Sequence, residues 1–232
     1  MFEFILQHPL FGLVITLVSF RLGQIAYDRS GKKTYCQPVV VGMALVILVL
    51  LVFNIPYSQY FESAKPLHLL LGPVTIALAI PLYQNLKRIR ALLLPIVLTV
   101  FIASTITVGL AVIILCVFGA SEISLLSMST KSITTPIAMI VSEEIGGLAS
   151  LSATFVMTTG VLGAVLGPPI LDRLGIKDDG VKGFALGLTA HAVGTARALE
   201  ISEECGAFSA LAMGLTGIFT AIFLPLIIFI VY

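Results

Sequence analysis

Residues 183–202 read GFALGLTAHAVGTARALEIS, and this stretch decides how the rest of the chain is interpreted. It is long and apolar enough to cross a bilayer, yet it contains His191 and Arg197 and is interrupted by Gly187 and Gly194. A charge at bilayer depth costs about 3 kcal/mol on insertion scales, so intramembrane charges commonly face a cavity and serve a function. The stretch therefore predicts the anion-recognising centre of a membrane transporter.

The composition around this stretch is that of an integral membrane protein. Of 232 residues, 58% are hydrophobic and 11% are charged, and the mean hydropathy is +1.11. Soluble domains carry about 25% charged residues. No basic cluster with interleaved aromatics is present, so no nucleic-acid partner is expected. Cys36, Cys116 and Cys205 form neither a disulfide framework nor a zinc signature, so no metal or cofactor is expected.

Seven apolar runs are long enough to cross about 30 Å of hydrocarbon. They cover residues 9–27, 38–56, 66–84, 91–118, 148–168, 183–201 and 207–231. Because the runs lack the alternation of barrel strands, the predicted fold class is an all-α integral membrane protein with about seven transmembrane helices. Residues 1–232 are expected to form a single membrane domain.

Basic residues in the connections predict the orientation. Those assigned to one side are Arg21, Arg29, Lys32, Lys33, Lys87, Arg88, Arg90, Arg173, Lys177 and Lys182, against Lys65 alone on the other. The positive-inside rule makes the basic loops cytoplasmic. We therefore expect a multi-pass protein of the cell membrane with its N-terminus outside and its C-terminus inside.

An eighth apolar stretch, about 123–142, is shorter and more polar than the seven spans. Both of its ends fall on the outer side, which predicts a re-entrant hairpin that turns near Ser129–Thr135. A full crossing, with one further span misassigned, is the alternative. Irregular backbone at membrane depth requires protein or a wet cavity around it.

The predicted turn of this hairpin is rich in hydrogen-bond donors. Thr135 is expected to cap a half-helix over 136–142, with Pro136 as its first residue. The positive end of that half-helix, together with Lys131, Ser132 and Thr134, would bind an anion near mid-membrane. Ordinary capping in an interfacial loop is the alternative.

Spans two to four and five to seven run in opposite senses, which predicts inverted structural repeats over about 9–118 and 121–232. The middle span of each repeat is broken, by Gly72, Pro73 and Pro81 in one case and by Gly187 and Gly194 in the other. Paired broken helices indicate a transporter binding site. In span three, Pro73 and Thr75 are the candidates, and Pro81 would free backbone carbonyls, although a plain kink filled by packing is equally compatible.

Span six supplies the other candidate ligands. His191 and Thr195 are four residues apart and share a helix face, and Gly194 allows another backbone to approach closely. Arg197 offers a fork of donors that matches a carboxylate, and His191 is a second donor or a proton carrier. The alternatives are that Arg197 extends to the interface beside Glu200 and that His191 only packs.

Enzyme signatures are missing from the sequence: it has no HExxH, GxSxG, P-loop or dinucleotide motif. We therefore expect no enzymatic activity. Without a nucleotide site, transport would be driven by a gradient or facilitated.

Several stretches resemble the LrgB/CidB family of membrane proteins: KSITTPIA (131–138), TGVLGAVLGPP (159–169), GLTAHAVGTARALE (187–200) and GAFSALAMGLTG (206–217). Bacterial members are described as antiholin-like or holin-like partners of a small LrgA/CidA-type protein that affect murein hydrolase activity and autolysis. Plant relatives are plastid glycolate/glycerate translocators.

The resemblance implies a secondary transporter of small monocarboxylates of the glycolate, glycerate, pyruvate or lactate type. Its broken helices are similar to those of elevator-type carriers, and a homodimer is expected. The alternative is an antiholin/holin-like regulator that acts through an LrgA/CidA-type partner. A channel is a third interpretation.

Overall fold

The computed structural model describes residues 8–31, 36–70, 73 and 76–231, and within these residues every regular element is a helix. The chain divides into two compact units, Met1–Ala77 and Leu78–Tyr232. The predicted fold class, an all-α membrane protein, is confirmed at this level. The predicted repeats, 9–118 and 121–232, do not follow this division and stay a prediction.

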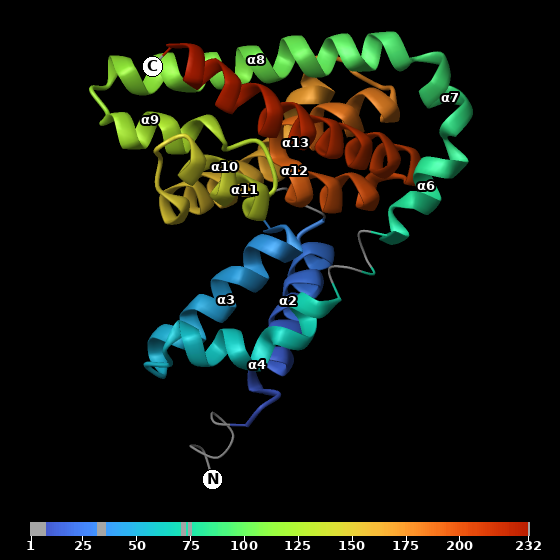
Figure 1. Cartoon of the computed structure of the whole chain (residues 1–232). Coiled ribbons are helices and arrows are strands. Elements are labelled where there is room, and N and C mark those ends of the chain that lie inside the picture. Colours follow the sequence, from blue (N-terminus) through green and yellow to red (C-terminus); the bar gives the residue numbers. More distant parts are fainter. Residues whose placement is uncertain (1–7, 32–35, 71–72, 74–75, 232) are drawn as a thin grey trace. The chain divides into compact units, whose positions relative to one another are not determined.

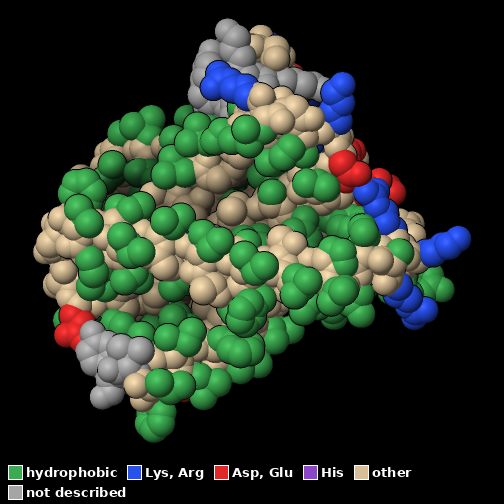
Figure 2. Space-filling model, turned by 90° about the horizontal axis from the view of Figure 1, so that it is seen from above, with side chains coloured by type: hydrophobic (Ala, Val, Ile, Leu, Met, Phe, Trp, Pro, Cys, Tyr) green, Lys and Arg blue, Asp and Glu red, His purple; other side chains and the backbone are tan. Residues whose placement is uncertain are grey.

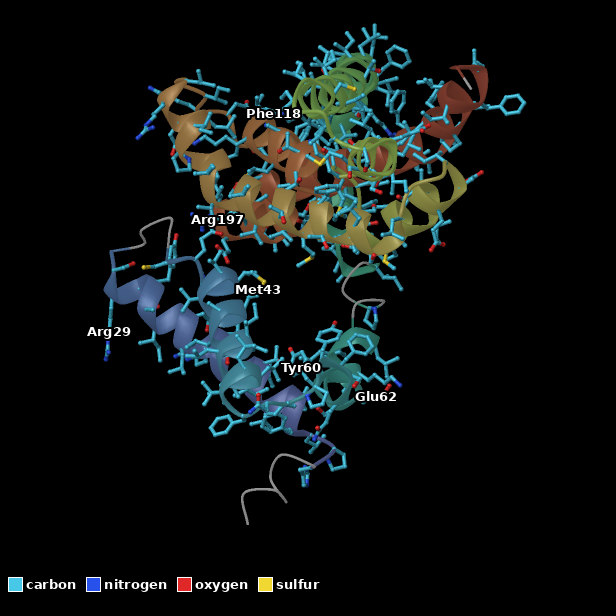
Figure 3. The ribbon with its side chains drawn as sticks, turned by 90° about the vertical axis from the view of Figure 1, so that its left-hand side faces the viewer. Arg29, Met43, Tyr60, Glu62, Phe118 and Arg197 are labelled. Atoms are coloured by element: carbon cyan, nitrogen blue, oxygen red, sulfur yellow. The ribbon has the colours of Figure 1, made fainter. Side chains whose placement is uncertain are left out.

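The first unit consists of α2 (Phe11–Arg29), α3 (Pro38–Val52) and α4 (Tyr57–Leu69), and both α3 and α4 pack against α2 (Figure 1). Tyr60 of α4 points toward α2, where its hydroxyl lies 2.8 Å from Thr16 Oγ1 (Figure 3). The backbone N–H of Gly12 donates to Ser63 Oγ at 2.9 Å. Hydroxyl groups and a glycine thus join α2 and α4.

The second unit begins with two short helices and continues with longer ones. Its elements are α6 (Ala79–Gln84), α7 (Leu86–Ala91), α8 (Leu93–Val117), α9 (Glu122–Ser129), α10 (Thr135–Glu144), α11 (Ala149–Arg173), α12 (Asp179–Ile201) and α13 (Glu203–Val231). Helices α12 and α13 form the most extensive pairing, and α11 packs against α9, α10 and α12. Figure 1 shows α8 lying along α13.

Among the described residues, three helices are long and apolar enough to cross a membrane: α8, α11 and α13. Their outward faces carry large apolar side chains. Figure 2, a view onto the side where α8 lies, shows hydrophobic side chains across the face and charged side chains at its edges, most of them at the upper and right-hand edges. The apolar helix α3 is shorter, with 15 residues. The structure therefore supports a membrane protein, while the predicted number of seven spans is not confirmed.

Span three, predicted over 66–84, is interrupted. Helix α4 ends at Leu69 and α6 starts at Ala79. Pro81 lies in the first turn of α6, where a backbone N–H has no partner within the helix in any case. The predicted freeing of backbone carbonyls by Pro81 stays a prediction.

Candidate functional site

Helix α12 does not cross the second unit, because the chain reverses at His191. The backbone at His191 has φ 42° and ψ −129°, which separates two helical legs. A straight helix of this length, 23 residues, would be about 35 Å long. Instead, Ser202 Oγ after its end donates to Asp179 Oδ2 at its start, at 2.7 Å. Helix α12 is therefore a hairpin whose two ends lie together.

This geometry corrects the prediction that 183–201 crosses the membrane. The glycines taken as helix breakers serve close packing instead. A Cβ atom at Gly187 would overlap the backbone of Ser209 on α13, and one at Gly194 would overlap the carbonyl of Leu186 on the facing leg. The break itself falls between the two glycines, at His191.

Residues 122–144 form a second hairpin, as the sequence predicted. Helix α9 has 8 residues and α10 has 10, so they are about 12 and 15 Å long, and neither crosses about 30 Å of hydrocarbon alone. The turn lies between Ser129 and Thr135.

The predicted cap of α10 is wrong by one residue. Thr134 is the N-cap, with φ −66° and ψ 144°, and its side chain makes no capping hydrogen bond. Thr135 is therefore the first helical residue, and Pro136 follows it within the first turn. Proline is tolerated there because the first N–H groups of a helix lack intrahelical partners.

The two hairpins approach α11 from its opposite ends. At the start of α11, the backbone N–H of Leu148 donates to Ser127 Oγ of α9 at 2.9 Å. Near its other end, Lys182 Nζ of α12 donates to Asp172 Oδ1 at 2.6 Å. Residues 148 and 172 are about 36 Å apart along a helix.

The turns of both hairpins meet on the first half of α11, over residues 152–160. Thr130 Oγ1 lies 2.6 Å from Ser152 Oγ, and both residues are buried. One helical turn further, His191 Nε2 lies 2.9 Å from the Val156 carbonyl oxygen. Because a carbonyl only accepts, Nε2 carries the hydrogen. Ile133, from the turn of the first hairpin, packs in one buried cluster with Val156.

Glycine makes room on α11 for the His191 ring. A Cβ atom at Gly160 would lie 2.6 Å from Cε1 and 2.8 Å from Nε2 of that ring. His191 is 2% exposed. We call the place where the two turns meet on α11, residues 130–134, 152–160 and 191, the tip site.

The tip site contains a cation and several donors. Lys131 Nζ donates to Ser132 Oγ at 3.1 Å, and the Lys131 side chain is half-buried. Its ammonium is close enough to interact electrostatically with His191. The N-terminal end of α10, which begins after Thr134, adds backbone N–H groups and a partial positive charge. This arrangement favours a small anion.

The other predicted ligands of span six lie away from Lys131 or have protein partners. Thr195 Oγ1 donates to the His191 carbonyl at 2.9 Å and lies 3.0 Å from Ser209 Oγ. Arg197 pairs with Glu200 at 2.6 Å on its own helix, which matches the alternative drawn from the sequence. Ligand roles for Gly194, Thr195 and Arg197 stay predictions.

The predicted ligands of span three are Pro73 and Thr75. Pro73 belongs to the first unit and is exposed. Thr75 lies outside the described residues. Their contribution to a site therefore stays a prediction.

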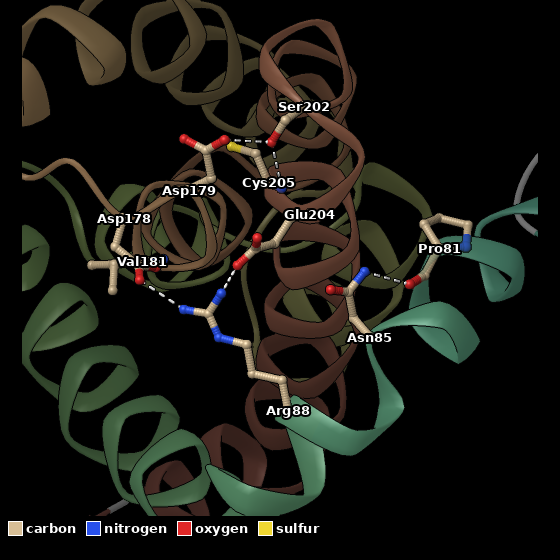
Figure 4. Close-up of polar contacts among 9 residues, drawn as sticks. All are labelled: Pro81, Asn85, Arg88, Asp178, Asp179, Val181, Ser202, Glu204 and Cys205. Atoms are coloured by element: carbon tan, nitrogen blue, oxygen red, sulfur yellow. Dashed lines mark hydrogen bonds and ion pairs between the residues drawn. The ribbon is translucent and has the colours of Figure 1, made fainter.

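Sequence reasoning missed an ionic cluster at the base of the α12 hairpin. Arg88 of α7 pairs with Asp178, the N-cap of α12, at 2.7 Å and with Glu204 at the start of α13 (Figure 4). The backbone N–H of Val181 and the Arg88 guanidinium hold the pKa of Asp178 below its usual value. The predicted crossing placed Asp178 and Glu204 on opposite membrane faces, so no sequence signal joined them.

Among the described residues, no group of three or more His, Cys, Asp or Glu side chains could hold a metal ion.

Three apolar helices long enough to span a bilayer, with helical hairpins packed between them, define this chain as an α-helical integral membrane protein. The comparisons identify its family. Residues 16–230 match the LrgB-like family, and the chain belongs to that family.

Its similarity to relatives covers nearly the whole chain. It is 31% identical over 220 residues to the holin-like protein CidB of Staphylococcus epidermidis, covering 95% of this chain and 96% of that protein. It is 32% identical over 221 residues to the holin-like protein CidB of Staphylococcus aureus, covering 95% and 96%. It is 33% identical over 216 residues to the uncharacterized protein YwbG of Bacillus subtilis, covering 93% and 96%. No solved structure matches the chain.

Proposed function

We propose that this chain is a secondary transporter of small monocarboxylates of the glycolate, glycerate, pyruvate or lactate type and that it has no enzymatic activity. The observation that supports this proposal is the meeting of two hairpins, from opposite ends of α11, at the tip site. Non-helical backbone at membrane depth is characteristic of transporter binding sites, where it lines a cavity.

The chemistry of the tip site supports a monocarboxylate. Lys131 would carry the charge complementary to one carboxylate, and the N–H groups at the start of α10 would donate to its oxygens. Ser132, Thr134 and Thr135 lie at the same turn and could bind a substrate hydroxyl or carbonyl. His191 closes the site from the other hairpin.

The arrangement also supports an inverted repeat, at a different place from the predicted one. Hairpin α9–α10 followed by α11 corresponds to hairpin α12 followed by α13. Gly183 and Gly187 lie against Cys205 and Ser209, so α13 runs parallel to the first leg of α12, whereas α11 runs antiparallel to that leg. Residues 122–173 and 179–231 would thus be the two repeats. Movement of this pair against a scaffold would be an elevator-type mechanism, which is an analogy of architecture.

Uptake of labelled glycolate, lactate and pyruvate into proteoliposomes tests the proposal. Lys131→Gln should lower uptake at least about tenfold, because a charge-assisted hydrogen bond to the substrate is lost. Lys177→Gln, in the exposed connection before α12, is the matched control and should leave uptake unchanged. Equal uptake by wild type and Lys131→Gln would refute the site, and absence of uptake of every acid by wild type would refute the transporter.

The names of the relatives support a second candidate more directly, a holin-like membrane protein. In this second proposal the chain regulates murein hydrolase activity through an LrgA/CidA-type partner, as the family resemblance implies. This candidate predicts no saturable uptake. It predicts instead that co-reconstitution with the partner releases a trapped dye from liposomes, with the same rate for wild type and Lys131→Gln. Dye release that requires the partner and persists in Lys131→Gln would favour the holin-like role.

A further inference from the structure

A groove of about 460 Å³ runs between α8 and the first leg of α12, away from the tip site. On α8, Pro95, Thr99, Ala103 and Thr107 line it at four-residue intervals, which places them on one helix face. Phe184 and Leu188 contribute from α12. The lining is almost entirely apolar, while the proposed substrate is small and charged. The groove therefore suits a different ligand.

The length of the groove matches a lipid chain. From Leu92 to Thr107, α8 advances about 22 Å. One leaflet contributes about 15 Å of hydrocarbon, half of a typical core. The groove is thus long enough for one acyl chain that enters beside α7 and extends toward the bilayer centre.

Charges of both signs stand at one end of the groove. Arg88 and Asp178 line this end, and Glu204 pairs with Arg88. Their side chains are 40%, 47% and 35% exposed, so a headgroup can reach them. Arg88 is also held over the Phe208 ring, with its guanidinium carbon 5.3 Å from the ring centroid (Figure 4 shows its ion pairs).

The net charge of these three side chains indicates which kind of lipid headgroup they can bind. One guanidinium and two carboxylates sum to −1, which favours a ligand that carries an ammonium group. The guanidinium has five N–H groups, so it can pair with both carboxylates and still donate to a phosphate. An ammonium group with N–H hydrogens can donate to Asp178 and Glu204, whereas a trimethylammonium group cannot.

We infer that this groove binds one phosphatidylethanolamine molecule, with an acyl chain along α8, the phosphate at Arg88 and the amine at Asp178 and Glu204. The site is independent of the proposed transport function. The lipid would bridge α7, α8 and the base of the α12 hairpin.

Native mass spectrometry of the full chain in detergent tests the site, with dioleoyl phosphatidylethanolamine and dioleoyl phosphatidylcholine as probes. These lipids share their chains and charges and differ in amine hydrogens. Wild type should hold the ethanolamine lipid about tenfold more tightly, the effect of a hydrogen bond to a charged group. Glu204→Gln should reduce that preference, and Ala103→Leu or Thr99→Leu should weaken both lipids by filling the groove. Lys87→Gln, which does not line the groove, should change neither.

Three results would overturn the inference. Equal affinity of wild type for the two lipids would contradict the assignment of the headgroup site. Unchanged lipid binding in both groove-filling variants, at an unchanged melting temperature, would contradict the assignment of the groove to an acyl chain. Tighter binding of dioleoyl phosphatidylglycerol than of the ethanolamine lipid would show a general basic surface instead.

Discussion

At the scale of single residues, His191 carries the reversal of α12. Its φ of 42° and ψ of −129° resemble the first central position of a type II′ turn, which favours glycine. A histidine is retained there while its ring donates to the Val156 carbonyl beside Gly160. Backbone strain of about 1–3 kcal/mol at such a position is typical of functional sites.

Two substitutions of His191 separate the effect of its backbone conformation on stability from the effect of its side chain. His191→Ala and His191→Gly both lose the bond to Val156, worth about 1 kcal/mol. At positive φ, His191→Gly should be the more stable of the two by about 1 kcal/mol. In a continuous helix the order would reverse by a similar amount. Thermal unfolding of the two variants in detergent measures the sign, and a more stable His191→Ala would contradict the hairpin.

The candidate site residues can be compared with what the sequence alone predicted. The donors of the predicted hairpin turn selected Lys131, and the rarity of charge in apolar stretches selected His191. The structure places both residues at hairpin turns that meet on α11, and their ligand roles stay predictions. The rarity of charge also selected Arg197, whose partner Glu200 lies on the same helix. Ser152 and Val156 were missed as parts of the tip site. A small hydroxyl and the backbone carbonyl of an apolar residue give no sequence signal that the side chains of Thr130 and His191 will bond to them.

At the scale of elements, two helix pairs depend on glycine for their spacing. In α12, Gly183 and Gly187 lie against the backbone of α13, and in α11, Gly163 and Gly167 lie against Ala190 and Leu186. Close approach of this kind is how membrane helices gain packing contacts without a hydrophobic driving force. The sequence analysis gave the glycines of span six two roles, breakage and close approach, and the structure supports close approach.

Two Gly→Ala variants at helical positions test whether glycine in these helices is needed for close packing. Gly187→Ala should destabilise the protein by about 2 kcal/mol or more, because the new methyl group overlaps the Ser209 backbone. A Cβ atom at Gly214 of α13 would have no neighbouring atom within 4 Å. Gly214→Ala should therefore stabilise the protein by about 1 kcal/mol, because alanine has the higher helix propensity. Melting temperatures in detergent report both changes. Equal shifts in the two variants would show that α12 and α13 are not in close contact.

At the scale of the whole molecule, hydropathy correctly predicted a helical membrane protein and the positions of α8, α11 and α13. It could not distinguish a hairpin from a crossing over 183–201, because both bury a run of about 20 apolar residues. Charge counting predicted the turn between α9 and α10, and it missed the hairpin of α12, because Glu203 and Glu204 were assigned to the outer face. The membrane topology of both hairpins stays a prediction. The ion pair between Arg88 and Glu204 places that end of α13 beside the basic α7.

This correction leads to a new prediction for the orientation of the second unit. Lys177 precedes α12 and Glu203 follows it, and the bond between Asp179 and Ser202 brings these two ends together. If the basic connections are cytoplasmic, both positions face the cytoplasm. The C-terminal end of α13 then faces outward, opposite to the orientation expected from seven spans.

Single cysteines in a variant lacking Cys36, Cys116 and Cys205 can decide the orientation. Lys177→Cys and Glu203→Cys should react with a membrane-impermeant maleimide only when the cytoplasmic face is exposed, because a hairpin returns its ends to one side. Glu122→Cys, at the start of α9, should react only from outside. Labelling of Lys177→Cys and Glu203→Cys from opposite faces would instead require α12 to cross the bilayer, a distance that a chain reversed at His191 cannot span.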